Sequence, residues 1–147
     1  MLLKLAPLIL IAGAGVWSQS PAIPDTPAGR QFAAWREVFN RGDRAALKAF
    51  LDKNYPSDPR GVDPQMDFRE MTGGFDLKKV ESSTPDTLVA LLLERNSDQF
   101  GRLTLEVEPV EPDKIVRFGI MAIPRPAEFP IAHLSTSTLV AAVWVWI

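Results

Sequence analysis

Hydrophobic positions recur along this chain with two different periods, a helical one in the first half and an alternating one in the second. Phe32, Trp35 and Phe39 are spaced at i, i+3 and i+7, so they fall on one face of a helix. Thr26 is a suitable residue to cap the start of this helix, and Gly42 is a suitable residue to end it. The pattern therefore predicts a first helix between these two residues.

Two further helices are predicted before the alternating pattern begins. Asp43 is placed to cap the second helix, and Pro56 stops it because proline cannot continue a helix. Asp63 and Pro64 open a shorter third helix. The apolar residues of the second helix are Leu47, Phe50 and Leu51, and those of the third are Met66, Phe68 and Met71.

A glycine pair, Gly73 and Gly74, stands at the point where the period changes. Phosphate-binding loops run from a strand into a helix, and a Lys-Ser/Thr pair follows their glycines. Here the order is helix to strand, and no such pair follows. We interpret Gly73 as a helix C-cap with positive φ and Gly74 as the residue that releases the chain into a strand.

Four alternating runs follow the glycine pair: FDLKKV, DTLVALLLER, RLTLEVE and KIVRFGIMAI. In the third run Leu103, Leu105 and Val107 point to one side, and the polar residues between them point to the other. The links between runs are short, as antiparallel neighbours require. The predicted fold class is α+β, with N-terminal helices packed on one face of an antiparallel sheet of four or more strands.

The ends of the chain differ in composition from its middle. Residues 1–20 combine a positive start, an apolar run and small residues, which is the layout of a secretory signal peptide. Residues 21–26 are expected to form a linker, residues 27–130 a single domain, and residues 131–147 an atypical apolar tail. This tail is either a buried final strand or an unprotected sticky end.

These ends indicate an exported protein. The apolar run at the N-terminus is shorter than a spanning helix needs, so a membrane contact is expected only if the signal segment stays uncleaved. The chain has no cysteine and therefore no disulfide. The expected location is a bacterial periplasm or the cell exterior.

The charges argue against a nucleic-acid partner. The 16 basic and 18 acidic residues are interspersed and form no basic patch.

No group of residues in the sequence carries a recognisable reaction. The chain lacks the Ser-x-x-Lys and Gly-x-Ser-x-Gly patterns of serine hydrolases, and its one histidine, His133, has no orienting acid nearby. One histidine and no thiol also exclude the common zinc sites. The acidic run of Glu106, Glu108, Glu111 and Asp113 is interpreted as a solvated strand face rather than a calcium site. We expect no catalytic residue, no metal and no cofactor.

A pocket between the helices and a curved sheet is nevertheless conceivable. The candidate ligand-binding residues are Trp35, Tyr55, Asp67 and Phe118, with Asp76 as a further candidate acid or base. The competing interpretation places the aromatic residues in the core and the aspartates in solvent.

Three stretches between about residues 26 and 129 carry a family resemblance. Their most specific pieces are TGGFDL, ERNSDQF and PRPAEF. The chain resembles the N-terminal SnoaL-like, ketosteroid-isomerase-like accessory domain of secreted bacterial serine hydrolases of the β-lactamase-related or tail-specific peptidase type. The resemblance implies a cone-like fold. In that family the serine chemistry belongs to a second, C-terminal domain, which has no counterpart in these 147 residues.

The expected function is therefore that of a non-catalytic, exported accessory or binding domain of a serine hydrolase, truncated relative to its family. Its expected partners are a hydrolase catalytic domain or a second copy that associates through the sheet. The alternative is a stand-alone protein, either a small-ligand-binding protein or an isomerase-like or cyclase-like enzyme, that uses a carboxylate inside the cone.

Overall fold

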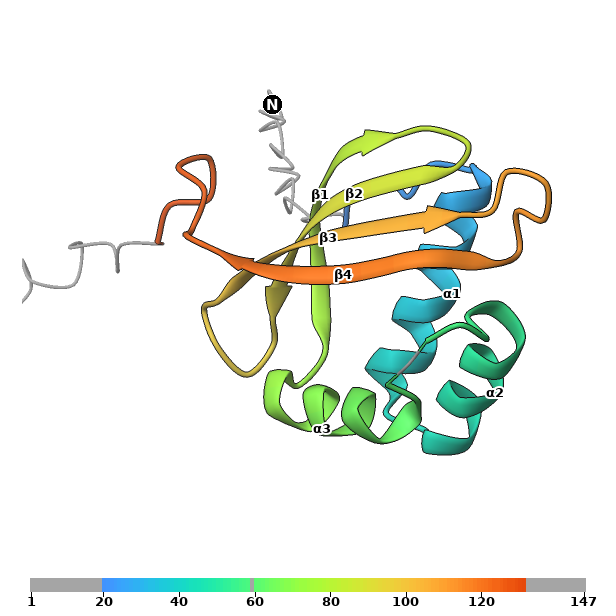
Figure 1. Ribbon diagram of the computed structural model, residues 1–147. Coiled ribbons are helices and arrows are strands. Elements are labelled where there is room, and N and C mark those ends of the chain that lie inside the picture. Colours follow the sequence, from blue (N-terminus) through green and yellow to red (C-terminus); the bar gives the residue numbers. More distant parts are fainter. Residues whose placement is uncertain (1–19, 59, 132–147) are drawn as a thin grey trace, which may run out of the picture.

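Three helices pack on a four-stranded antiparallel sheet (Figure 1). The computed structural model describes residues 20–58 and 60–131. The elements in chain order are α1 (Pro27–Arg41), α2 (Arg44–Asn54), α3 (Val62–Thr72), β1 (Phe75–Ser83), β2 (Thr87–Glu94), β3 (Phe100–Val107) and β4 (Ile115–Ile123). The α+β class predicted from the two hydrophobic periods is confirmed, and the arrangement is consistent with a cone-like fold.

The helix ends follow the capping residues. The Thr26 side chain accepts a hydrogen bond from the Gly29 backbone N–H at 3.0 Å, and the Asp43 carboxylate accepts from two backbone N–H groups of α2. Both predicted caps are confirmed. The third helix begins at Val62, one residue before the predicted Asp63, and its N-cap is Gly61.

The strands form a meander in the order β1-β2-β3-β4, with every neighbour antiparallel. Helix α1 packs across β1, β2 and β3, whereas α2 and α3 pack on α1 and on each other. In Figure 1, α1 runs behind the strands and α2 and α3 lie at its lower end. The core fills the space between α1 and the inner sheet face, with Phe32, Trp35 and Phe39 against side chains such as Leu92 and Leu103.

The Gly73–Gly74 pair is the structural corner that the sequence predicts. Gly73 is the left-handed C-cap of α3, with φ of 72°, and its N–H donates to the Arg69 carbonyl. A Cβ on Gly73 would lie 2.2 Å from the Asn96 side chain, and one on Gly74 would lie 2.6 Å from Asn40. Glycine is required here both by the backbone angle and by the close approach of neighbouring side chains.

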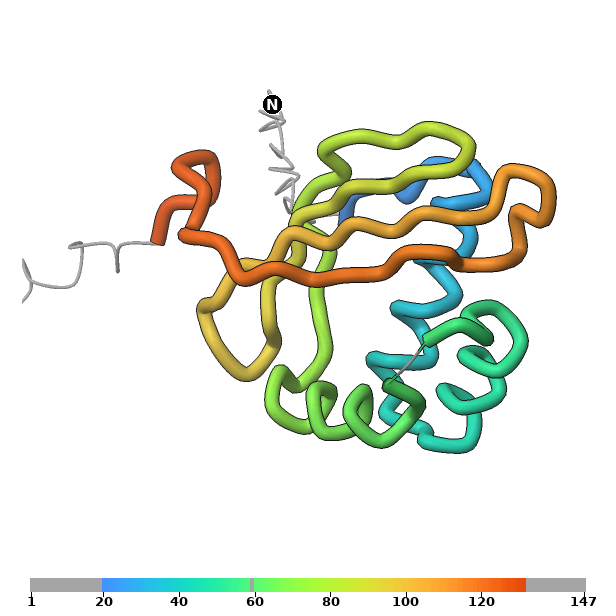
Figure 2. The backbone as a smooth tube through the Cα atoms, in the orientation of Figure 1, coloured from blue at the N-terminus to red at the C-terminus, as the bar shows by residue number. Residues whose placement is uncertain are grey.

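The segment after β4 folds back onto the outer face of the sheet. Residues 124–131 carry Phe129, whose ring stacks on Phe100 at 5.4 Å between centroids, and Arg125, whose guanidinium lies 5.1 Å from the same ring centroid. Glu128 adds an ion pair with Lys79 of β1 at 2.9 Å. Figure 2 shows this segment turning at the end of β4. A second, smaller apolar cluster therefore lies on the sheet face opposite the helices, and it buries Phe100 to 1% exposure.

Several predictions concern residues outside the described ranges. The signal peptide up to residue 19, His133 and the apolar tail from residue 132 lie there. Among the described residues, none of the helices is long and apolar enough to cross a membrane.

Candidate functional site

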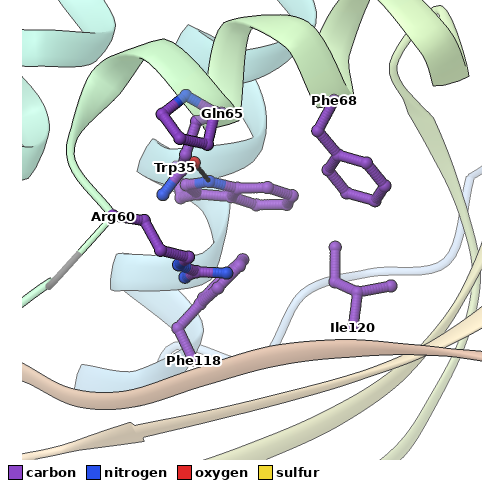
Figure 3. A pocket seen from close by; sticks show the side chains of 7 residues that line it. Trp35, Arg60, Gln65, Phe68, Phe118 and Ile120 are labelled. Carbon is purple, nitrogen blue, oxygen red and sulfur yellow. Dashed lines mark hydrogen bonds between the residues drawn. The ribbon is translucent and has the colours of Figure 1, made fainter.

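An apolar cleft opens between the helices and the edge strand β4. It has a volume of about 210 Å³ and is lined by Trp35, Arg60, Pro64, Gln65, Phe68, Phe118 and Ile120. Figure 3 shows Trp35 at its centre, with α3 on one side and β4 on the other. Helix α1 packs across β1, β2 and β3, and the cleft lies where Phe118 and Ile120 of β4 face Trp35 of α1 and the side chains of α3.

Trp35 forms the back wall of the cleft. It is 1% exposed, and its ring centroid lies 4.7 Å from that of Phe118 and 4.8 Å from that of Phe39. The indole Nε1–H donates to the Gln65 side-chain oxygen at 3.4 Å, a long hydrogen bond. Trp35 is therefore a core residue and a cleft residue at once, and its orientation is fixed from α1, α3 and β4.

A polar group holds the entrance of the cleft in shape. The Asp58 carboxylate accepts from the Arg60 backbone N–H at 3.1 Å, from the Arg60 Nε–H at 3.0 Å and from the Gln65 amide at 3.0 Å. The Asp58 side chain is 2% exposed, whereas that of Arg60 is 47% exposed. The result is a chain of contacts from Arg60 through Asp58 and Gln65 to Trp35, visible in part in Figure 3.

Asp58 is stabilised in its ionised form. Burial by itself raises the pKa of this carboxyl, but the hydrogen bonds from Arg60 and Gln65 together outweigh burial, so the pKa of Asp58 lies below its ordinary value of 3.8. A carboxylate with a low pKa and three donors is a weak base near neutral pH. Asp58 therefore acts as an anchor for Arg60 and not as a proton acceptor.

Arg60 supplies the positive charge at the cleft. Within residues 20–58 and 60–131, its hydrogen bonds involve the backbone N–H and Nε, so its two terminal nitrogens are left for a ligand. Arg60 and Phe118 both line the cleft, as Figure 3 shows. Aromatic walls with one half-exposed guanidinium at the rim suit a small apolar group that carries a negative charge.

The residues singled out from the sequence are only partly brought together. Trp35 and Phe118 line the cleft. Tyr55 is 9% exposed, belongs to the core and borders a different, smaller hollow beside α2. Asp67 is exposed on α3, and Asp76 pairs with Arg95 at 2.9 Å at the solvent-exposed end of β1.

Arg60, Gln65 and Asp58 were not among the site residues predicted from the sequence. Phe68 and Ile120 were recognised only as apolar residues of a helix and a strand. The sequence did contain one signal, a charged pair flanking Pro59 in a proline-rich loop between two helices. Loops of that kind frequently position binding groups on a rigid scaffold.

No metal site accompanies the cleft. The described part of the chain contains no group of three or more His, Asp or Glu side chains that could hold an ion. In the acidic run that begins at the end of β3, Glu106 is instead paired with Arg117 of β4 at 3.1 Å.

Comparisons with known proteins gave no matching family model, no similar curated protein and no similar solved structure.

Proposed function

We propose that this chain is an exported, non-catalytic binding domain, an accessory part of a serine hydrolase, which holds a small apolar group bearing a carboxylate in the cleft of Trp35 and Arg60. The observation that carries the proposal is the composition of this cleft. Its walls are apolar and aromatic, its lining includes one cation, Arg60, and the Asp58 carboxylate is paired with that cation. The link to serine hydrolases is supported by the resemblance of the TGGFDL, ERNSDQF and PRPAEF stretches.

The size of the cleft narrows the ligand class. At about 210 Å³ it is smaller than the pockets that enclose a drug-sized molecule, which start at roughly 300 Å³. A single aromatic ring or short aliphatic chain fits, such as the last side chain of a peptide whose terminal carboxylate reaches Arg60. That ligand class suits a domain that presents peptide-like material to a hydrolase.

The ionised state of Asp58, whose carboxylate is bonded to Arg60 and Gln65 of the cleft, favours binding over an isomerase-like reaction. Such an enzyme needs a carboxyl with a raised pKa that faces its substrate. Asp58 has a lowered pKa, and each of its oxygens accepts at least one hydrogen bond from Arg60 or Gln65.

A fluorescence titration tests the proposal. In the full chain with Trp17, Trp144 and Trp146 changed to Phe, Trp35 is the only indole. The probe is 4-phenylbutyrate, and its neutral counterpart is 4-phenylbutan-1-ol. We expect a saturable change in Trp35 emission with the acid and about tenfold weaker binding of the alcohol, since a charge-assisted hydrogen bond contributes about 1.4 kcal/mol or more.

Three variants assign the charge effect to Arg60. Arg60→Gln should reduce the affinity for the acid to that for the alcohol, and Arg60→Lys should restore most of it because the charge is kept. Arg41→Gln, at an exposed arginine paired with Glu37 near the end of α1, is the matched control and should leave binding unchanged. Equal affinities for acid and alcohol, or no saturation with either, would refute the proposed function.

A further inference from the structure

The two edges of the sheet are built differently. Strand β1 carries Asp76, Lys78, Lys79 and Glu81, and its pairing with β2 is interrupted by two register shifts. Charges and bulges on an edge strand prevent other strands from pairing with it. Edge β1 is therefore protected against association.

Strand β4 has no such protection. Its nine residues, IVRFGIMAI, contain one charge, Arg117, no proline and a single register shift, near its start. Among the described residues it pairs with β3 alone. Val116 is 47% exposed and Met121 is 72% exposed. A long, nearly uncharged edge strand with exposed apolar side chains is suited to pair with another strand.

We propose that β4 pairs with β4 of a second copy of this chain, antiparallel and centred on Gly119, to form an eight-stranded sheet. This register places Arg117 opposite Met121 of the partner, so the two arginines do not face each other. It also places apolar side chains opposite one another elsewhere along the strand. In the regular part of the strand the remaining cross-strand pair is Phe118 with Ile120, whose side chains lie on the inner face; the register shift at Val116 ends the regular pairing before Ile115.

Charge and symmetry both favour a second copy as the occupant of this edge. The pairing uses the same surface on both partners, and the protected β1 edge prevents the sheet from growing further. The two-fold axis passes through the sheet at Gly119, so both inner faces lie on the same side. The β4 walls of the two clefts, Phe118 and Ile120, then meet across the seam. This inference stands independently of which ligand the cleft binds.

The register can be read by cross-linking, because the chain has no cysteine of its own. Directly opposed residues in antiparallel strands have Cα atoms about 4.5 or 5.5 Å apart, within disulfide range. A Cβ on Gly119 meets nothing within 4 Å, so Gly119→Cys is compatible with the fold. We expect the full chain with Gly119→Cys to form a covalent dimer under mild oxidation at low protein concentration.

Two controls make the result specific. Val110→Cys lies in the exposed β3–β4 loop and should remain uncross-linked. A mixture of Arg117→Cys and Met121→Cys chains, which the proposed register places opposite each other in the regular part of β4, should cross-link to each other far more than either does alone. The proposal would be overturned if Gly119→Cys failed to form a covalent dimer, or if Val110→Cys formed as much covalent dimer as Gly119→Cys.

Sedimentation of the uncross-linked chain gives a second readout. We expect a dimer for the wild type, a monomer for Val116→Lys, and a dimer for the matched control Val110→Lys. A monomeric wild type would overturn the proposal. If such a monomer also protected the β4 amides from hydrogen exchange, residues 132–147 of the same chain would be the occupant instead. A dimer that persists in Val116→Lys would place the contact on another surface.

Discussion

Replacing Gln65 by methionine removes the residue that links the cleft entrance to its back wall. Gln65 is 6% exposed and donates to the Asp58 carboxylate at 3.0 Å, while its oxygen accepts from the Trp35 indole at 3.4 Å. Methionine has a similar volume, so the change removes both hydrogen bonds without opening a large cavity.

The expected loss of stability follows from the two hydrogen bonds. A hydrogen bond to a charged group contributes about 1.5–3 kcal/mol, and a buried indole N–H left without an acceptor costs about 1 kcal/mol at this donor distance. The free energy of unfolding should therefore fall by roughly 2.5–4 kcal/mol. For a domain of this size, each kcal/mol lowers Tm by about 4 °C, so Tm should fall by roughly 10–16 °C.

Urea unfolding followed by far-UV circular dichroism measures this loss. Asp67→Met, at an exposed position on the same helix, is the control, and it should change the free energy of unfolding by about 0.5 kcal/mol or less. If Gln65→Met unfolded within that margin of the wild type, the chain of contacts from Arg60 to Trp35 would not hold the cleft in shape.

Three further predictions concern the corner, the buried acid and the segment after β4. Gly73→Ala should lower the free energy of unfolding by about 1–3 kcal/mol, because alanine is strained in the left-handed backbone conformation and its Cβ would clash with the Asn96 side chain. Adding Asn96→Gly removes the clash but not the backbone strain, so it should recover only part of this loss. The pKa of Asp58 is lower in the folded chain than 3.8, so its contribution to stability is complete above pH 3.8 and is lost as the pH falls through the folded-state pKa. Urea unfolding at several pH values should therefore show that the free energy of unfolding falls less steeply with acid in Asp58→Asn than in the wild type. Phe129→Ala should cost about 1–3 kcal/mol in the same unfolding assay because it uncovers Phe100, and an unchanged midpoint would show that residues 124–131 are not part of the fold.

Local signals were sufficient to predict the elements of the fold. The caps Thr26 and Asp43 and the glycine corner at Gly73 each act within a few residues of their own position, so their effect can be read from the sequence. The alternation of Leu103, Leu105 and Val107 likewise reflects burial of one strand face.

The cleft depends on contacts that local patterns do not encode. Arg60 and Phe118 are far apart in sequence, yet both line the cleft. The buried Asp58 carboxylate likewise finds its hydrogen-bond donors in Arg60 and Gln65, and no hydrophobic periodicity reveals that pairing. For the same reason, the exposed Asp67 on α3 was as plausible a candidate from the sequence as any residue that lines the cleft.

The most direct test of the binding account is an NMR titration of the ¹⁵N-labelled chain with 4-phenylbutyrate. The indole N–H of Trp35 and the Nε–H of Arg60 report on the back wall and the rim of the cleft. The account predicts that both signals shift together and saturate, that amides of the outer sheet face stay in place, and that the ligand spectrum remains unaltered over time. Unmoved Trp35 and Arg60 signals, or chemical conversion of the ligand by the protein, would contradict it.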